Sequence, residues 1–210
     1  MLVHAAAGGV GLKAVEYCHW LCGSVLATAG RAHKHAQLRS VGVRWLCSSR
    51  DGIAFSPGAA RLLTASRTHA VLNSLSLDFI AASFALLGES GAFEEIGKRG
   101  IWSTERHAAA STSTSYCAIA LDVDMANDPI WMQGVLALLS KRADAMQLSS
   151  LPLRAFDLEQ QYELAFRTLQ GGLNTGKIVI LVAPKRPPHG AHAVSGGTGT
   201  VSYTHLRAHE

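Results

Sequence analysis

The amino-acid sequence predicts an α/β protein in which a doubly wound parallel sheet of the Rossmann type is flanked by helices. Over roughly the first hundred positions, short apolar runs alternate with helical segments of about ten residues, which is typical of βαβ units. A glycine-rich turn at 6–11 follows the first apolar run and opens the first helical segment. The chain has 210 residues, 48% of them hydrophobic, which is enough to bury one sizeable core.

The expected elements follow from hydrophobic periodicity. Short apolar runs predict strands at 2–5, 24–28, 44–47, 70–72 and 92–96. Helical spacing predicts helices between them at 10–21, 32–41, 55–64 and 77–87. In the first of these helices, Val10, Ala14, Cys18 and Leu21 fall on one face, which we expect to pack against the sheet.

After Gly97 the pattern changes. Segment 102–115 is rich in Ala, Ser and Thr, which predicts a loop or irregular crossing, and 116–121 is expected to be extended. A helix is predicted at 129–141 with Pro129 at its start, then an extended segment at 153–156 and a helix at 158–170. A strand at 177–182 should lie apart from the sheet of the first five strands.

Composition excludes several classes of protein. The formal net charge is only +4, and +2 of it comes from Lys185, Arg186 and Arg207 against Glu210 near the end of the chain, so nucleic-acid binding is not expected. No uncharged apolar run approaches the ~20 residues of a membrane helix, and a cytoplasmic location is expected.

The four cysteines offer no disulfide framework. Cys18 and Cys22 lack a second pair of ligands for structural zinc, so no metal is predicted.

The turn Ala6-x-Gly8-x-x-Gly11 stands where a dinucleotide-binding fingerprint should. Small residues there allow backbone N–H groups at the start of a helix to approach a pyrophosphate. The alternative is a glycine-rich turn that binds nothing.

The end of the second strand favours NADP over NAD. An NAD site would place a carboxylate about twenty residues beyond the fingerprint, but segment 28–34 contains none. Arg31 and Lys34 suit a 2′-phosphate instead, and Arg50 after the third strand could add to the positive field. The alternative is a solvated helix N-terminus.

Four motifs in order carry a resemblance to a known family: 2–11 (LVHAAAGGVG), 71–75 (VLNSL), 95–98 (EIGK) and 175–179 (TGKIV). They resemble the enoyl reductase domain of polyketide synthases and animal fatty acid synthase, in the medium-chain dehydrogenase/reductase superfamily. The resemblance covers roughly residues 1–183. It implies NADPH as the cofactor, bound by Gly8, Gly9, Val10, Gly11, Lys34, Asn73, Ser74, Thr175, Gly176 and Lys177. Arg31 stands where many members have a small hydroxyl residue, and it joins the cofactor-binding set, with Arg50, on the charge argument alone. The alternatives are a helix-capping role for Asn73 and an ordinary turn at 175–177.

The resemblance also implies a domain organisation. Residues 1–183 would be the Rossmann part of an enoyl reductase and its C-terminal return segment, without the family's N-terminal GroES-like half. Residues 184–191 read as a Pro-rich linker, and 192–201 look like the truncated start of a ketoreductase domain. Residues 202–210 look like a non-native tail, so the chain is expected to be a fragment of a multidomain synthase.

The implied activity is NADPH-dependent reduction of the C=C bond of a carrier-bound trans-2-enoyl thioester. Lys98 and Asp122 align with the family's two proposed proton donors, and Asp124 competes if the alignment slips. Without its missing half, the fragment alone is expected to be inactive. The expected partners are an acyl carrier protein and other synthase domains in the same polypeptide, and a homodimer is left open. Two alternatives are a standalone quinone or alkenal reductase and a non-catalytic Rossmann fragment.

Overall fold

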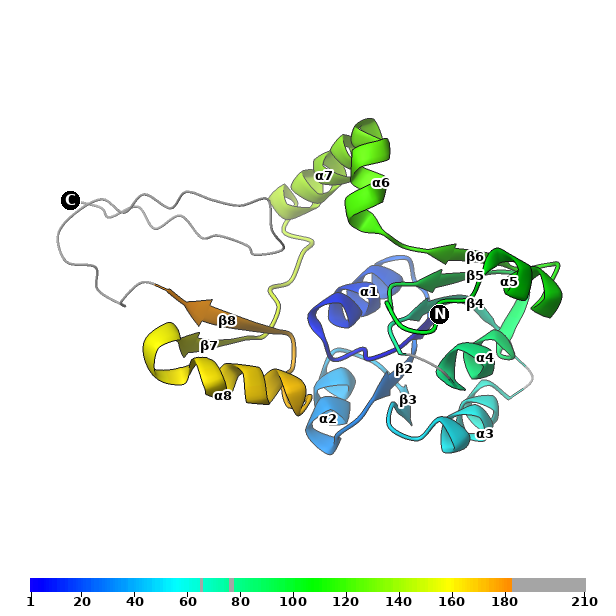
Figure 1. The fold of residues 1–210 in the computed structure, drawn as a ribbon, viewed down its shortest axis with the longest axis horizontal. Coiled ribbons are helices and arrows are strands. Elements are labelled where there is room, and N and C mark those ends of the chain that lie inside the picture. Colours follow the sequence, from blue (N-terminus) through cyan, green and yellow to red (C-terminus); the bar gives the residue numbers. More distant parts are fainter. Residues whose placement is uncertain (65, 76–77, 183–210) are drawn as a thin grey trace.

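The computed structural model describes residues 1–64, 66–75 and 78–182 (Figure 1). Within these ranges, six parallel strands form one sheet in the order β3-β2-β1-β4-β5-β6. This is the strand order of a doubly wound dinucleotide-binding fold, so the predicted fold class is confirmed. The strands are β1 (Leu2–Val3), β2 (Leu26–Ala29), β3 (Trp45–Ser48), β4 (Thr68–Asn73), β5 (Leu87–Glu95) and β6 (Ser115–Ala118).

The helices that alternate with these strands form a layer on each face of the sheet. They are α1 (Gly9–Trp20), α2 (Ala32–Ser40), α3 (Gly52–Leu63), α4 (Asp78–Phe84) and α5 (Thr104–Ala110). Successive strand residues point to opposite faces, so Leu2 belongs to a core cluster with α3 and α4. Its neighbour Val3 belongs to the cluster formed with α1 and α2.

Three local predictions are corrected. Segment 102–115 contains the helix α5, because Ser103 caps its N-terminus by accepting a hydrogen bond from Arg106 N at 3.2 Å. The segment predicted to be extended at 116–121 is shorter than expected: it is β6 (Ser115–Ala118), the sixth strand of the sheet. A further helix, α6 (Leu121–Asn127), then begins at Leu121. The buried face of α1 includes Leu12 and Val15, whereas Val10 and Leu21 are more than half exposed.

The C-terminal part stands beside the sheet. Helix α6 forms a hairpin with α7 (Pro129–Asp144), and β7 (Leu153–Asp157), α8 (Leu158–Gln170) and β8 (Lys177–Leu181) form a βαβ unit (Figure 1). Strands β7 and β8 make their own two-stranded parallel sheet. The prediction that the strand at 177–182, which is β8, lies apart from the main sheet is therefore confirmed. The predicted linker at 184–191, the ketoreductase start at 192–201 and the tail at 202–210 lie outside the described residues.

The C-terminal part touches the sheet domain at few points. One is Arg142 of α7, whose guanidinium lies 3.5 Å from the centroid of the Trp20 ring at the end of α1. Another is the contact of Ser149 with Lys13 and Glu16 of α1. No described helix is both long enough and apolar enough to span a bilayer.

Candidate cofactor-binding site

The glycine-rich turn joins β1 to α1 at the carboxyl edge of the sheet. Ala5 has a φ of 47°, and Gly8 N donates to Ala5 O at 3.0 Å, which closes the turn. A Cβ on Gly11 would lie 2.5 Å from Ala6 Cα, so only glycine allows this approach of helix to strand. In the described part of the chain no side chain caps α1, and its first turn has no acidic residue, which leaves its N-terminus suited to an anion.

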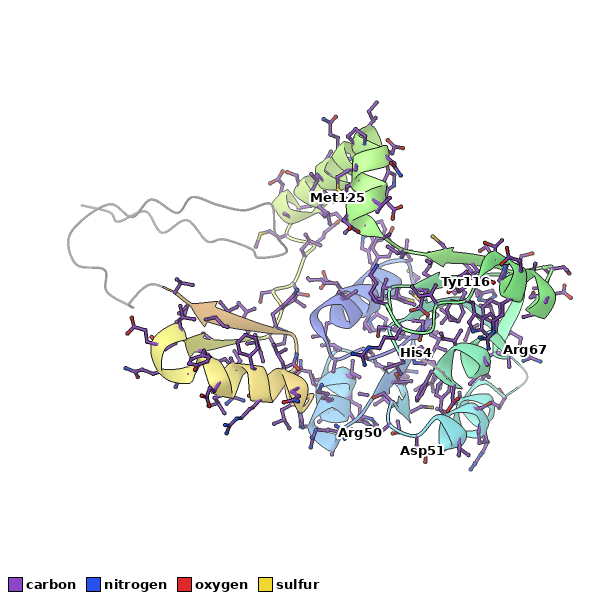
Figure 2. The ribbon with its side chains drawn as sticks, viewed as in Figure 1. His4, Arg50, Asp51, Arg67, Tyr116 and Met125 are labelled. Atoms are coloured by element: carbon purple, nitrogen blue, oxygen red, sulfur yellow. The ribbon has the colours of Figure 1, made fainter. Side chains whose placement is uncertain are left out.

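A buried hydrogen-bond network formed by His4, Thr28 and Ser83 holds the glycine-rich turn in place. Ala5 N donates to Thr28 Oγ1 at 3.1 Å, and Ala6 N donates to Thr28 O at 2.9 Å. His4 Nδ1 lies 3.1 Å from the same Thr28 hydroxyl, and its Nε2 lies 2.6 Å from Ser83 Oγ of α4. His4 is buried in the sheet domain (Figure 2). This burial lowers its pKa to about 3, so the ring is neutral.

Three cations gather at the carboxyl ends of β2 and β3. Arg31 precedes α2, Lys34 lies in its first turn, and Arg50 follows β3. Burial lowers the pKa of Lys34, and the nearby charges of Arg31 and Arg50 lower it further. Within the described ranges none of the three has a carboxylate within 4.0 Å. Arg50 packs so closely over Gly30 that a Cβ there would meet its Nε at 2.6 Å.

The C-terminal unit, formed by β7, α8 and β8, contacts both the glycine-rich turn and the cluster of cations. Gly176, with a φ of 68°, donates from its N to Ala7 O at 2.8 Å and bridges to Gly8. The Lys177 side chain covers Gly9, where an added Cβ would lie 2.8 Å from Lys177 Cε. Thr175 is half-buried beside them. The fold thus brings 8–11 and 175–177 together, as the order of the motifs suggests.

Contacts also link the cation cluster to the end of α8. Arg31 Nη2 donates to Gly171 O at 3.1 Å, while the buried Arg31 Nε has no hydrogen-bond partner among the residues that the structure describes. His33 Nε2 lies 3.2 Å from Leu173 O. Arg31 is therefore held at the junction between the sheet and the end of α8.

The carboxyl ends of β4 and β5 form the third region of the site. Asn73 is fully buried, and its Nδ2 donates at 2.6 Å both to Leu75 O and to Glu95 Oε2. Ser74 Oγ donates to His4 O at 3.4 Å. Glu95 was not singled out in the sequence as a site residue, although it opens the EIGK motif; its burial depends on the pairing of β5 with its neighbours.

The two predicted proton donors are both exposed. Lys98 follows β5 and its Nζ donates to Ile119 O at 3.1 Å. Asp122 lies in the first turn of α6, as does Asp124, and no ion pair joins Lys98 to Asp122. Their catalytic role stays a prediction.

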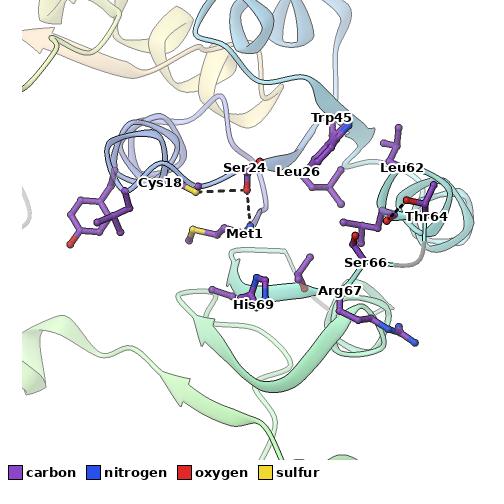
Figure 3. A pocket seen from close by; sticks show the side chains of 16 residues that line it. Met1, Cys18, Ser24, Leu26, Trp45, Leu62, Thr64, Ser66, Arg67 and His69 are labelled. Atoms are coloured by element: carbon purple, nitrogen blue, oxygen red, sulfur yellow. Dashed lines mark hydrogen bonds between the residues drawn. The ribbon is translucent and has the colours of Figure 1, made fainter.

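A cavity of about 680 Å³ opens at the opposite edge of the sheet (Figure 3). Met1, Leu26, Trp45 and His69 are among the residues that line it, at the amino ends of the strands. Ligands of open α/β sheets bind outside the carboxyl ends, so this cavity is not the cofactor site.

No family model matches the chain. Among curated proteins it is 37% identical over 201 residues to the polyketide synthase GfsB of Streptomyces halstedii, covering 96% of this chain and 3% of that protein. It is 36% identical over 203 residues to the spectinabilin polyketide synthase system protein NorB of Streptomyces orinoci, covering 96% and 9%. The chain therefore spans only a small part of the curated relatives it matches.

Solved structures point to one part of such synthases. The CurK enoyl reductase is 31% identical, with a TM-score of 0.78 over 85% of this chain and 53% of the other. The nucleotide-binding subdomain of the enoyl reductase domain of PpsC from Mycobacterium tuberculosis is 27% identical, with a TM-score of 0.62 over 71% and 84%. A quinone oxidoreductase from Pseudomonas syringae, 19% identical with a TM-score of 0.70, shows the fold alone.

The fold is that of a doubly wound α/β unit of the Rossmann type. The chain is homologous to polyketide synthases, and the part of them that it matches in structure is the enoyl reductase domain of the medium-chain dehydrogenase/reductase superfamily. The resemblance found in the four sequence motifs is thereby confirmed.

Proposed function

We propose that this chain is the NADPH-binding part of an enoyl reductase that reduces the C=C bond of a trans-2-enoyl thioester. The observation that carries the proposal is the convergence of Arg31, Lys34 and Arg50 beside the glycine-rich turn, with no carboxylate in segment 28–34 at the end of β2. A 2′-phosphate would meet three cations there, whereas the ribose hydroxyls of NADH would find no acidic partner.

Each part of NADPH has a candidate binding region. The gathered positive charges of Arg31, Lys34 and Arg50 fit the adenosine 2′-phosphate. The uncapped N-terminus of α1 at 8–11 fits the pyrophosphate. Asn73 and Ser74 on one side and Thr175, Gly176 and Lys177 on the other fit the nicotinamide end at the carboxyl edge of the sheet.

The reduction needs a hydride at the β-carbon and a proton at the α-carbon of the enoyl group. NADPH supplies the hydride when it is bound. For the proton, Lys98 Nζ is the candidate donor and Asp122 the group that would orient it, with Asp124 as a second candidate on the same helix turn. The hydrogen bond of Lys98 to Ile119 O supports this role because it holds the ammonium group at the end of β5.

The proton-donor proposal has a direct test in a reductase that contains this chain. General acid catalysis contributes typically 10²–10⁴-fold, so the Lys98→Ala, Asp122→Ala double variant should lose about that much in kcat. NADPH affinity should barely change. Near-full turnover would mean that the proton comes from water or from another group.

The wider partners are part of the proposal. The curated relatives are much longer synthases, which supports further synthase domains in the same polypeptide. The substrate would then arrive on an acyl carrier protein, and a homodimer could pair through β6, an edge strand of the sheet with three of its four residues exposed. The isolated chain should bind NADPH without reducing a crotonyl thioester.

Equilibrium binding to the 210-residue chain tests the cofactor proposal. NADPH should bind at least about tenfold more tightly than NADH, because one charge-assisted hydrogen bond is worth about 1.5–3 kcal/mol. Lys34→Ala should remove about tenfold to a hundredfold of NADPH affinity and leave NADH nearly unchanged.

The matched control is Lys141→Ala, an exposed lysine in the last turn of α7 that is remote in sequence from the cation cluster. Lys141→Ala should change neither the affinity for NADPH nor the affinity for NADH. Equal affinity of the wild-type chain for the two cofactors would contradict the proposal, and an equal loss of both in Lys34→Ala would mean that Lys34 is structural.

A further inference from the structure

A buried carboxylate lies at the carboxyl edge of the sheet, on β5, between β4 and the edge strand β6. Glu95, the last residue of β5, is 1% exposed, and within the described ranges no lysine, arginine or histidine side chain lies within 4.0 Å of its oxygens. Burial of an unpaired carboxylate is costly unless hydrogen bonds replace its hydration. A purely structural position at the end of a strand would be filled at lower cost by an apolar side chain.

Both oxygens of Glu95 accept hydrogen bonds from neutral donors. Asn73 Nδ2 donates to Oε2 and Gly97 N donates to Oε1, each at 2.6 Å. A Cβ on Gly97 would itself lie 2.6 Å from Oε1, so this contact requires glycine. Burial raises the pKa of Glu95, and the two hydrogen bonds oppose that rise. An ionised carboxylate matches two donors, whereas a neutral amide would turn an N–H group toward one of them.

These contacts connect the loop after β4, which carries Asn73 and Ser74, to the loop after β5, which carries Lys98. Through Asn73, Glu95 reaches Leu75, whose carbonyl accepts the other hydrogen bond of Asn73 Nδ2 and whose N donates to Asn73 Oδ1 at 3.3 Å. Through Gly97, it fixes the residue directly before Lys98. Its backbone carbonyl accepts from Ile119 N at 2.8 Å, and Ile119 O in turn holds Lys98 Nζ.

We propose that Glu95 is a positioning residue whose ionised carboxylate sets the Asn73–Leu75 loop and the Lys98 loop relative to each other at the nicotinamide side of the site. The inference rests on the proposed reductase function, because the groups it places matter only if nicotinamide binds between them. Glu95 touches neither the adenosine side nor the phosphate-binding turn. Its loss should therefore change how the nicotinamide end is held and leave overall NADPH affinity nearly intact.

The test compares Glu95→Gln with Glu94→Gln in the full 210-residue chain. Glu94 is the preceding strand residue and points to the other face of β5, so it controls for removal of a charge at this strand end. In Glu95→Gln, the NMR signals of the Asn73 side-chain amide and the Gly97 and Lys98 backbone amides should move, while the Lys34 signal stays in place. NADPH affinity should stay within about twofold, and the change in nicotinamide fluorescence on binding should fall by at least half. Glu94→Gln should resemble wild type.

Two results would overturn the inference. One is unchanged Asn73 and Lys98 signals in Glu95→Gln. The other is an equal loss of NADPH affinity and nicotinamide signal, which would make Glu95 a general structural residue. If the wild-type chain binds no NADPH, the proposed function fails, and the NMR comparison alone still decides whether Glu95 positions these loops.

A wild-type titration covers the case in which Glu95→Gln does not fold. Protonation of Glu95 places an O–H group against a donor, so the Asn73 side-chain amide should shift with a midpoint above the ordinary pKa of a glutamate. The ionisable group that faces Glu95 from β6 is Tyr116, which stays neutral in this range because its own pKa is raised. An Asn73 signal that does not follow this titration would contradict the proposal.

Discussion

The six-stranded sheet and the C-terminal part differ in how their apolar residues are used. Of the buried apolar side chains in the described ranges, all but Phe156 and Ala165 come before residue 97. The sheet has a cluster of them on each face. In the C-terminal part, Ile130, Leu153 and Phe166 are each more than half exposed. The sheet is therefore stabilised by its own core, and the C-terminal part much more by local structure and a few contacts.

The difference matters for the site because the proposed cofactor position is built from both regions. The cations, the glycine-rich turn and the Asn73–Glu95 pair belong to the sheet, whereas 175–177 belong to the C-terminal unit. At the site, the two regions meet at Gly176 N–Ala7 O, Arg31–Gly171 and His33–Leu173. We expect the sheet to hold its half of the site whether or not the C-terminal unit is docked.

The largest expected effect is the loss of the sheet core in Phe93→Ala. Phe93 is fully buried in β5 and stacks on Phe84 at a centroid distance of 4.8 Å. Truncation of such a residue costs about 3–5 kcal/mol, so the main unfolding transition in urea should shift by that amount. A loss below about 1 kcal/mol would contradict the view that this core stabilises the sheet.

Phe156→Ala should affect the C-terminal unit alone. Phe156 of β7 is buried, but the Arg154 guanidinium lies 4.8 Å from its ring centroid, so one of its neighbours is a charged group. We expect a cost near the lower end of the range, about 3 kcal/mol. Hydrogen exchange should accelerate in β7, α8 and β8 and stay unchanged in β1 and β4. Acceleration throughout the sheet would show that the two regions unfold as one.

The sequence predicted most elements of both regions: α7, β7, α8 and β8 stand close to their expected positions, as do the first five strands. Strand and helix periodicity is strong where elements bury one face, so all five strands expected before Gly97 are present. The error in α1 arose because Val10 and Leu21 lie at its ends, where side chains extend past the sheet; the buried face runs through Leu12, Val15 and Cys18. Helix α5 was missed because Ala, Ser and Thr suit loops as well as short helices.

The candidate site was predictable where it is local in sequence and hidden where it is not. Gly8, Gly11 and Lys34 follow from the spacing of one βαβ unit. The Glu95–Asn73 pair joins residues 22 apart, and the His4–Ser83 contact joins residues 79 apart. No periodicity reports such contacts, since they depend on which strands are neighbours in the sheet.

Acid should destabilise the sheet through His4. Its pKa is about 3 in the folded chain and near 6.5 when unfolded, so the unfolded state binds more protons as the pH falls below 6.5. The free energy of unfolding should drop by about 1 kcal/mol per pH unit between about pH 6 and pH 4 from this group. The free energy of unfolding, measured by urea titration at each pH, should fall less steeply with decreasing pH in His4→Gln than in the wild type. The control is His69→Gln, at an exposed position on β4, which should have the wild-type slope. Equal slopes in all three would mean that His4 is accessible to protons when folded.

The smallest expected effect is at the junction of the two regions, in Arg31→Lys. Lysine keeps the positive charge but cannot reproduce the planar guanidinium that donates to Gly171 O. The lost hydrogen bond at this half-buried position should cost about 0.5–1.5 kcal/mol, seen as faster hydrogen exchange at the end of α8. NADPH affinity should fall no more than severalfold, because the charge that would face the 2′-phosphate remains. Arg39→Lys, at the exposed end of α2, is the matched control and should change neither measurement. If Arg31→Lys lowers NADPH affinity as much as Lys34→Ala while α8 exchange stays unchanged, Arg31 belongs to the cofactor site alone and the two regions are not joined through it.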